Sequence, residues 1–552
     1  MTERLTIALA QLNPTVGDIF ANADLVRAAR AQAKIQGADL VVTSELVISG
    51  YPPEDLVLKG SFQDAVRTAV SALALETSDG GPGLLVSAPW VENGNLFNAA
   101  LLLDGGRILA VVPKFELPNY GVFDEKRLFS AGTCPGAVSF RGLKLGIMTC
   151  EDMWTPKVVK CVMEDGADIL LVLNGSPYEM DKTGTREALA QDRVRETGLS
   201  LVYVNQVGGQ DELVFDGASF VLDAEGQVSA QLPSFADDVV SVGFVLDNDT
   251  LVPTPSPLAA KLDDDEAIYR ALVLGLRDYV NKNHFPGVMI GLSGGVDSAL
   301  TAAVAVDALG ADRVHCVMMP SPYTSKESLE DAARAATTLG AKLDTITINP
   351  AMNAFDDMLK ELFVQHAKDT TEENIQARSR GMILMAMSNK FGYMVLSTGN
   401  KSEMSVGYST LYGDMCGGYN VLKDVYKTRV YDLCRWRNAN HPKDLEGPGG
   451  DVVPTRIITK APSAELKHDQ TDQDSLPPYA DLDDILWCLI EQEMSTAEIA
   501  ARGHDKDLVR KVWSMLDRAE YKRRQAPPGV KISSRAFGRD RRYPLTNGFT
   551  AN

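Results

Sequence analysis

The pattern of apolar and polar positions in the first half of the chain alternates between strand-like and helix-like stretches. Short apolar runs rich in β-branched residues predict strands at 5–12, 38–46, 84–90, 99–104, 107–113, 143–149, 167–173 and 199–205. Apolar residues at helical spacing predict a helix over 22–36 that ends near Gly37. Asp104-Gly105-Gly106 is typical of a hairpin turn between two strands. We therefore expect an α/β unit with mixed strands.

The second half of the chain repeats the alternation with a different order. Its pattern predicts strands at 288–292, 314–319, 342–348 and 393–397, with helices at 267–281, from Ser298, at 325–339 and at 374–391. This order is typical of a doubly wound parallel sheet, which binds ligands at the carboxyl ends of its strands.

A stretch without apolar periodicity separates the two halves. Residues 251–266 contain a Pro-rich run followed by four consecutive acidic residues, and repeated Pro blocks both a helix and a central strand. The length of 552 residues is also too great for one ordinary domain of roughly 150 residues. We therefore predict two domains, at 1–250 and 267–552, joined by a linker at 251–266.

Composition narrows the classes of function. The chain is 45% hydrophobic and 23% charged, which is enough to fill large cores, and no apolar run reaches the roughly 18 residues of a membrane helix. The amino-terminal residues lead directly into the first predicted strand without an apolar signal segment, so a cytoplasmic protein without a membrane partner is expected. A net charge of -20 would repel a phosphate backbone and disfavours nucleic acid as a partner.

The seven cysteines are an odd number and form no Cys-x-x-Cys motif. This arrangement argues against a disulfide framework and against a structural zinc site. One of the cysteines is therefore a candidate for chemistry.

Three ionisable residues in the first half each lie just beyond a predicted strand. They are Glu45, Lys114 and Cys150, and residues 1–283 contain no histidine to serve as a base for a thiol or hydroxyl nucleophile. Because strand ends can converge on one site, Lys114 could lower the pKa of the Cys150 thiol and Glu45 could take and return its proton. The alternative is that Cys150 is an inert buried thiol, which is the usual state of a lone cysteine after a strand.

The residues around these three positions resemble the nitrilase superfamily, whose amidases use a Glu-Lys-Cys triad. The resemblance covers about residues 1–245 and rests on Ser44-Glu45-Leu46, Gly50-Tyr51-Pro52-Pro53-Glu54-Asp55-Leu56, Pro113-Lys114 and Cys150-Glu151-Asp152-Met153-Trp154. It implies an αββα sandwich in which Glu45 is the general base, Lys114 stabilises the oxyanion and Cys150 attacks an amide carbon. It also implies the glutamine-binding residues Tyr120, Ser176 and Lys182, although ordinary loop packing remains open for Tyr120 and Ser176. Glu125 is either a supporting carboxylate or a solvated surface residue.

A glycine-rich turn in the second half follows a predicted strand and precedes a helix. It consists of Gly291, Leu292, Ser293, Gly294, Gly295, Val296, Asp297 and Ser298. Small residues at this place let backbone N–H groups wrap a phosphate at the amino terminus of the helix. The turn lacks the lysine of a P-loop and the spacing of a dinucleotide fingerprint, and Asp297 suggests a magnesium ligand instead.

Residues 293–298 resemble the pyrophosphate loop of the ATP pyrophosphatases, which cleave ATP to AMP and pyrophosphate while adenylating a substrate. Downstream motifs resemble NAD synthetase within this group: Glu373-Asn374-Ile375-Gln376-Ala377-Arg378, Ser397-Thr398-Gly399-Asn400-Lys401-Ser402-Glu403, Tyr412-Gly413-Asp414, Val425-Tyr426-Lys427-Thr428 and Pro462-Ser463-Ala464-Glu465-Leu466.

The second resemblance assigns a role to each matched position. It implies that the turn, Thr398, Lys427 and Ser463 bind ATP, with Asp297 and Glu403 as ligands of Mg²⁺. Asn374, Arg378, Glu403 and Lys522 match positions that bind nicotinic acid adenine dinucleotide (deamido-NAD). The Met415-Cys416-Gly417-Gly418 segment departs from the Gly-Asp-Gly turn of ammonia-dependent members, so another group must replace its second aspartate. The basic cluster at 522–542 fits a small phosphorylated ligand better than nucleic acid.

Together the two halves resemble the glutamine-dependent NAD(+) synthetases along about residues 3–545. This resemblance implies that glutamine is hydrolysed at Cys150 and that the ammonia passes through the protein to the adenylated carboxylate. It also implies a homo-oligomer, by analogy alone. Two alternatives share part of the pattern: an asparagine-forming or GMP-forming amidotransferase, and a non-enzymatic ATP-sensing protein.

Overall fold

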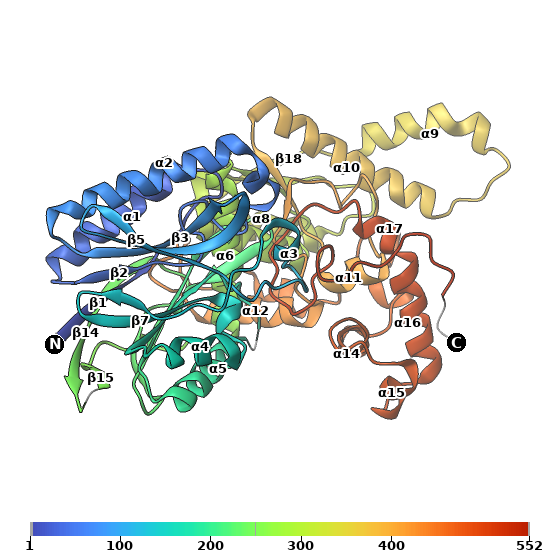
Figure 1. Cartoon of the computed structure of the whole chain (residues 1–552). Coiled ribbons are helices and arrows are strands. Elements are labelled where there is room, and N and C mark those ends of the chain that lie inside the picture. Colours follow the sequence, from blue (N-terminus) through green and yellow to red (C-terminus); the bar gives the residue numbers. More distant parts are fainter. Residues whose placement is uncertain (1–3, 181, 249, 550–552) are drawn as a thin grey trace. The chain divides into compact units, whose positions relative to one another are not determined.

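The computed structural model describes residues 4–180, 182–248 and 250–549 (Figure 1). Contacts along the backbone divide the chain into two compact units, Met1–Leu262 and Asp263–Asn552. Each unit has its own sheets and its own hydrophobic core.

Two large β-sheets form the centre of the first unit. The seven-stranded sheet has the order β15-β14-β1-β2-β3-β4-β5 and the six-stranded sheet the order β13-β12-β9-β8-β7-β6. The strands of the first sheet are β1 (Arg4–Gln11), β2 (Leu40–Val42), β3 (Gly83–Glu92), β4 (Asn95–Asp104), β5 (Arg107–Pro113), β14 (Asp238–Asp247) and β15 (Thr250–Pro253). Those of the second are β6 (Val138–Phe140), β7 (Leu143–Thr149), β8 (Ile169–Asn174), β9 (Leu201–Asn205), β12 (Phe220–Leu222) and β13 (Val228–Gln231), beside a separate ribbon of β10 (Val207–Gln210) and β11 (Leu213–Asp216).

Helices cover the outer face of each sheet and give a four-layer α-β-β-α sandwich. A core of side chains such as Ile7 and Leu171 fills the space between the sheets. The helices α1 (Ile19–Ile35) and α2 (Gly60–Glu76) pack on the seven-stranded sheet, and α4 (Pro156–Glu164) and α5 (Lys182–Thr197) pack on the six-stranded sheet (Figure 1). Short helical turns complete the unit: η1 (Glu54–Leu58), η2 (Thr77–Asp79), α3 (Glu125–Leu128) and η3 (Cys150–Met153). The predicted sandwich is confirmed.

Several of the strands predicted from the sequence are buried on both faces. Seven of the eight residues of β1 are buried, which is why the run is continuously apolar. The partly buried β14 was not predicted, although the similarly exposed β5 was. The predicted linker also begins too early, because Leu251–Pro253 continue β15 along β14 at the edge of the sheet, where Pro is tolerated.

A five-stranded parallel sheet forms the centre of the second unit, as predicted. Its order is β18-β17-β16-β19-β20, so the strand order reverses between β16 and β19. The strands are β16 (Val288–Gly291), β17 (Val314–Met318), β18 (Lys342–Thr345), β19 (Met394–Ser397) and β20 (Tyr419–Asn420). The helices around the sheet are α6 (Asp264–Lys282), α7 (Val296–Leu309), α8 (Lys326–Leu339), α9 (Asn349–Phe363), α10 (Thr370–Phe391), α11 (Lys401–Val406), α12 (Lys427–Ala439) and α13 (Thr455–Thr459), with the turn η4 (Ala311–Arg313).

A helical subdomain ends the second unit. It contains η5 (Asp472–Asp474), α14 (Tyr479–Ile490), α15 (Thr496–Ala501), α16 (Lys506–Arg518) and α17 (Glu520–Arg523). These helices share a core that includes Leu486, Val512 and Leu516. The basic residue Lys522 of α17 is thereby held at a fixed place beside α11.

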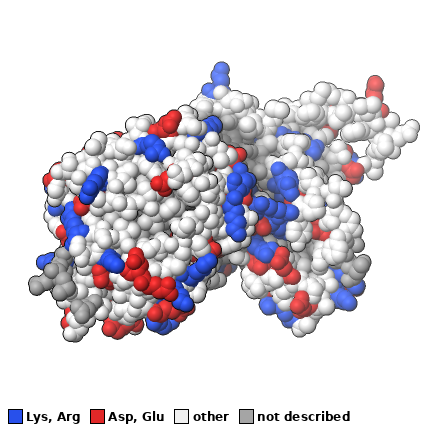
Figure 2. All heavy atoms as spheres, in the orientation of Figure 1, with Lys and Arg blue, Asp and Glu red and all other residues white. Residues whose placement is uncertain are grey.

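The surface carries both signs of charge. Figure 2 shows acidic and basic side chains interspersed on the visible face of the first unit. Among the described helices, none combines the length and the apolar composition that crossing a membrane requires.

Candidate active sites

A buried lysine joins two carboxylates in the first unit. The Nζ of Lys114 donates to Oε1 of Glu45 at 2.7 Å and to Oε1 of Glu125 at 2.9 Å. Asn98 donates to Oε1 of Glu45 at 2.7 Å, and the backbone N–H of Gly175 donates to Oε2 at 3.0 Å. Glu45 is therefore fixed by three donors.

Strand ends deliver the three predicted catalytic residues. Lys114 directly follows β5, Glu45 lies just beyond β2, and Cys150 begins η3 after β7. The backbone N–H of Glu45 also donates to the carbonyl of Asn174 at the end of β8, which links the two sheets here. Cys150 has a φ of 46°, a left-handed conformation that is costly for a residue with a Cβ and is typical of functional turns.

Charge and burial set the protonation of Cys150. Burial and the neighbouring carboxylate of Glu45 raise the pKa of the thiol well above its usual value, and the opposing effect of Lys114 does not outweigh them. Burial would lower the pKa of Lys114, but Glu125 and Glu45 raise it, so the lysine stays charged. Lys114 thus lowers the pKa of the thiol as expected, but burial and the charge of Glu45 outweigh its effect.

Glu125 belongs to this network and is not a solvated surface residue. Its side chain is almost fully buried and also accepts from the Tyr51 hydroxyl at 3.0 Å. Burial raises the pKa of Glu125 to about 7, although Lys114 opposes this shift. Tyr51 and Asn98 were not identified from the sequence, because a tyrosine in a loop and an asparagine in a strand carry no distinctive signal.

The predicted glutamine-binding residues lie around the turn that carries Cys150. Tyr120 is 53% exposed and its hydroxyl donates to Glu151, the residue after Cys150, at 3.0 Å. Lys182, at the start of α5, lies with its Nζ 5.8 Å from the ring centre of Phe123, which in turn contacts the Tyr120 ring. Tyr120 thus contacts the residue next to Cys150, and the Lys182 ammonium is also paired with Glu179 at 3.6 Å.

Ser176 is held by a buried arginine that was not identified from the sequence. Arg186 of α5 donates through Nε to the Ser176 hydroxyl at 3.1 Å and through Nη2 to the Ser176 carbonyl at 2.9 Å. Its Nη1 donates to both carboxylate oxygens of Asp216, at 2.7 and 2.9 Å. The arginine therefore fixes the loop after β8 on which Ser176 lies.

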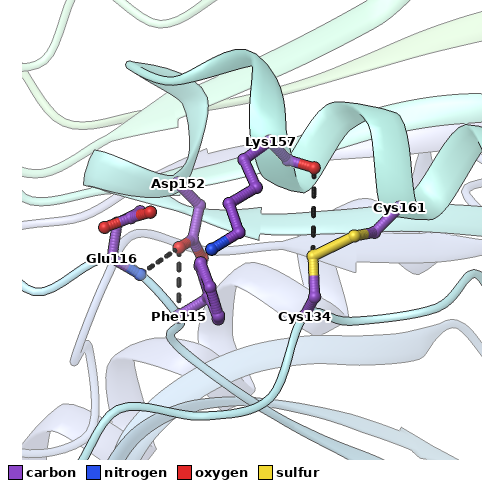
Figure 3. Close-up of a disulfide and its surroundings, with 6 residues drawn as sticks. All are labelled: Phe115, Glu116, Cys134, Asp152, Lys157 and Cys161. Atoms are coloured by element: carbon purple, nitrogen blue, oxygen red, sulfur yellow. Dashed lines mark hydrogen bonds between the residues drawn. A yellow bond between two sulfur atoms is a disulfide. The ribbon is translucent and has the colours of Figure 1, made fainter.

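A carboxylate clasp joins the segment after Lys114 to the turn of Cys150. Figure 3 shows Oδ1 of Asp152 accepting from the backbone N–H groups of Phe115 and Glu116, at 3.1 and 2.8 Å. Its Oδ2 accepts from the N–H of Thr149 at 3.1 Å. Lys157 lies over the Phe115 ring, 4.3 Å from its centre. Two of the catalytic segments are thus bonded to the same side chain.

A disulfide lies beside this clasp and corrects one expectation. Cys134 and Cys161 are bonded, between the loop after α3 and helix α4 (Figure 3). The odd number of cysteines and the absence of Cys-x-x-Cys argued against a disulfide framework, and this single bond was not predicted. The two residues are 27 positions apart, and only folding brings them together. The other five cysteines, Cys150 included, are free.

A cavity of about 620 Å³ lies at the carboxyl end of the parallel sheet in the second unit. It is lined by residues from the glycine-rich turn and from the downstream motifs, which are far apart in the sequence. Of the predicted binding residues, the lining includes Gly291, Leu292, Ser293, Gly295, Val296, Asp297, Thr398, Lys427, Ser463, Asn374, Glu403 and Lys522. Three do not line it: Gly294 and Ser298 lie within the turn, and Arg378 is exposed and donates to the Leu411 carbonyl.

The shape of the glycine-rich turn depends on Gly294. Its φ is 80°, and a Cβ at this position would lie 2.3 Å from the carbonyl oxygen of Ser328 in α8. Ser298 stabilises the turn from inside, because its hydroxyl accepts from the N–H of Ser293 and donates to the carbonyl of Gly295. Helix α7 then begins at Val296, so its free N–H groups face the cavity side of the turn.

Two carboxylates and one lysine meet beside the turn. Lys427 donates to Asp297 at 2.5 Å and to Glu403 at 3.0 Å. Asn400 orients the Asp297 carboxylate through its Nδ2, and its Oδ1 caps helix α11 by accepting from the backbone N–H of Glu403. Burial raises the pKa of Glu403 to about 7, and although burial would lower the pKa of Lys427, the two acids raise it.

The remaining predicted residues line the same cavity at different places. Asn374 of α10 accepts from the hydroxyl of Thr410 at 2.9 Å, and Lys522 donates to the carbonyls of Gly407 and Ser409. Ser463 donates to the Gln470 carbonyl, and Thr398 follows β19. Other lining residues were not identified from the sequence as ligands, notably Arg380, Asp414, Lys460 and Asp472.

Comparison with known proteins matches each unit to a family model. Residues 6–248 match the carbon-nitrogen hydrolase model and residues 268–526 match the NAD synthase model. The glutamine-dependent NAD(+) synthetase of Rhodobacter capsulatus is 49% identical over 547 residues, covering 99% of both chains. The enzyme of the same name from Acinetobacter baylyi is 46% identical, covering 98% of both.

Solved structures agree with these matches over the full length. The structure of the glutamine-dependent NAD+ synthetase from Acinetobacter baumannii in complex with ADP has a TM-score of 0.79 and 44% identity, covering 100% of both chains. The enzyme from Cytophaga hutchinsonii has a TM-score of 0.84 at 20% identity, covering 99% of this chain and 98% of that one, and shows the shared fold.

An amide-hydrolase sandwich and an ATP-binding parallel sheet on one chain define a fused, ATP-dependent amide-forming ligase. Two relatives of this kind match nearly the whole chain at 49% and 46% identity. The chain belongs to the glutamine-dependent NAD(+) synthetases.

Proposed function

We propose that the protein converts deamido-NAD to NAD, using glutamine as the nitrogen source and ATP as the activating co-substrate. The observation that carries this proposal is the pairing of two built sites on one chain. One is a buried Lys114 bridging Glu45 and Glu125 near Cys150, and the other is the turn with Asp297 at a large cavity.

The first site supplies the groups for amide hydrolysis. The Cys150 sulfur attacks the carboxamide carbon of glutamine while Glu45 takes the thiol proton, and the positive charge of Lys114 stabilises the oxyanion that forms. Glu45 then gives the proton to the leaving nitrogen, ammonia departs and a thioester remains. Water, deprotonated by Glu45, releases glutamate. Tyr120, Ser176 and Lys182 are proposed to hold the substrate.

The second site supplies the groups for carboxylate activation. A nicotinate carboxylate is a poor electrophile, and transfer of AMP from ATP converts it to a mixed anhydride with a good leaving group. The turn 291–298, Thr398, Lys427 and Ser463 are proposed to bind ATP. Asn374, Arg378, Glu403 and Lys522 are proposed to bind deamido-NAD, with Arg378 reaching it from outside the cavity lining.

The carboxylates of Asp297 and Glu403 suit Mg²⁺. They converge on the single ammonium of Lys427, and magnesium is usually held by one or two carboxylates together with substrate phosphates. When bound, the ion neutralises charge on the phosphates of ATP. Asn400 holds the Asp297 carboxylate and the backbone of Glu403 beside each other.

Ammonia is proposed to pass between the sites without release to solvent. In water it is mostly ammonium, and water itself would destroy the adenylate. A cytoplasmic location and a homo-oligomeric state complete the proposal, and both are predictions from the sequence and the family. The asparagine-forming, GMP-forming and non-enzymatic alternatives find no support in relatives that match the whole chain.

The test separates the half-reactions with one variant. Cys150→Ala should abolish NAD formation from glutamine and leave NAD formation from ammonium salt within about twofold of wild type. Cys488→Ala, which removes another buried thiol, is the matched control and should retain both activities. Wild-type protein that forms no NAD from either nitrogen source would refute the proposal.

A further inference from the structure

Several basic residues line the cavity of the second unit in addition to those predicted to bind ATP and deamido-NAD. Its lining includes Arg380, Lys427, Lys460, Lys467 and Lys522. Lys427 is neutralised by its bonds to Asp297 and Glu403, and Lys522 donates to two backbone carbonyls. Lys427 and Lys522 are therefore already bonded within the protein, and the other basic lining residues are further candidates for phosphate ligands.

Lys460 contacts Ser328, a residue that packs against the glycine-rich turn. It follows α13, and its Nζ makes one hydrogen bond, to the Ser328 hydroxyl at 2.7 Å. Within the described part of the chain, no carboxylate lies within 4.0 Å of this Nζ. Two of its three N–H donors are consequently free for a ligand in the cavity.

Ser328 connects this lysine to the turn that is proposed to bind ATP phosphates. Its carbonyl oxygen lies against Gly294, only 2.3 Å from where a Cβ of that residue would be. The nearby carboxylate of Glu465 is already occupied, because it accepts from the hydroxyls of Ser325 and Ser328. Lys460 therefore lies beside the turn without an acidic partner of its own.

We propose that Lys460 binds the β- and γ-phosphates of ATP and holds the pyrophosphate that leaves. This inference rests on the proposed function. In the adenylation step a nicotinate oxygen attacks the α-phosphorus, and the bond to the oxygen bridging the α- and β-phosphates breaks. The electron pair departs with pyrophosphate, whose growing negative charge the ammonium of Lys460 compensates.

Product inhibition of the ammonium-dependent reaction tests this role. Loss of a charge-assisted hydrogen bond in Lys460→Gln should raise the inhibition constant of inorganic pyrophosphate by about 10- to 100-fold and leave that of AMP within about twofold. Lys460→Arg, which keeps the charge, should recover most of the pyrophosphate binding. Lys390→Gln removes an exposed positive charge from the end of α10 and should behave as wild type.

Ser328→Ala distinguishes a ligand contact from a structural one. It deletes the hydroxyl that Lys460 contacts and keeps the ammonium, so pyrophosphate should still bind within a few fold of wild type. The proposal is overturned if pyrophosphate binds Lys460→Gln normally, if AMP binding weakens equally, or if Lys460→Arg is as defective as Lys460→Gln. Wild-type protein that forms no NAD from ammonium would instead refute the proposed function. This result is read from wild type alone, so it is distinct from any difference between the variants.

Discussion

Single residues determine which groups around Cys150 carry protons. Lys114 donates hydrogen bonds to both Glu45 and Glu125, so its positive charge is already paired with carboxylates in the absence of substrate. Burial and the charge of Glu45 raise the pKa of the thiol, which favours its protonated form. Glu45 is the proposed acceptor of this proton during attack.

The pH dependence of alkylation tests this protonation state. Because the pKa of Cys150 is raised, its reaction with iodoacetamide should keep accelerating with pH and show no plateau below pH about 9. Quantitative mass spectrometry of the peptide that contains Cys150 measures the rate. A plateau reached below pH 8 would mean that the resting residue is a thiolate.

Glu125 should matter to the first half-reaction alone. Glu125→Gln keeps the shape but weakens the bonds from Lys114 and Tyr51, and should reduce the glutaminase kcat by about 10- to 100-fold. Ammonium-dependent NAD formation should be unchanged. Glu92→Gln at an exposed strand position is the control, and equal glutaminase rates in both variants would remove Glu125 from the site.

At the site of Cys150, the sequence predicted only the residues that belong to recognisable motifs. Glu45, Lys114 and Cys150 could be identified because each follows a strongly apolar strand and matches a family motif. Asn98, Tyr51 and Arg186 could not, because their importance comes from buried contacts with residues that are far away in the chain.

At the scale of elements, the turn between β16 and α7 requires a left-handed residue that has no side chain. Gly294→Ala places a Cβ against the Ser328 carbonyl and should reduce ATP-dependent NAD formation by at least about 100-fold. Gly295→Ala is the matched change. The φ of Gly295 is −91°, which suits any residue, and a Cβ added there would lie 3.2 Å from the Ser293 hydroxyl oxygen and would meet no backbone atom of the described residues. Similar losses in both variants would contradict the argument from backbone geometry.

Helix α5 is anchored to the ribbon of β10 and β11 by a buried ion pair. Arg186→Met leaves Asp216 charged and without this partner, and should destabilise the first unit by about 3–5 kcal/mol. Thermal loss of glutaminase activity measures the effect. Arg195→Met, on an exposed face of the same helix, is the control and should shift the midpoint temperature of inactivation little. An equally small shift in Arg186→Met would show that the ion pair with Asp216 does not stabilise the first unit.

Elements were predictable where a strongly apolar run is bounded by turns, even in the weakly buried β5. The predicted bounds of β5 and β7 match the structure, because both strands are bounded by turns and are strongly apolar. The position of β14 beside β1 could not be predicted, since a partly buried strand does not specify its partner and the pairing spans more than 200 residues. The Cys134–Cys161 disulfide was missed because only folding brings the loop of Cys134 to helix α4.

For the whole molecule, the order of the two motif sets along the chain was the most informative feature of the sequence. Each set alone is compatible with several enzymes, because one fold supports many functions. Their combination on one chain predicted the two units and the family, and both predictions are confirmed. The cavity residues Lys460 and Arg380 emerged only from the structure, since basic residues outside a recognised role are too common to single out.

The central claim is that nitrogen released at Cys150 becomes the amide of NAD within the same protein. Mass spectrometry of the product from ATP, Mg²⁺, deamido-NAD and amide-15N glutamine, in an excess of unlabelled ammonium, tests it most directly. The account predicts predominantly labelled NAD from wild type and unlabelled NAD from Cys150→Ala. NAD whose label is fully diluted by the external ammonium would contradict transfer of ammonia inside the protein. Unlabelled NAD from wild type without added ammonium would contradict the claim that the nitrogen comes from the glutamine amide.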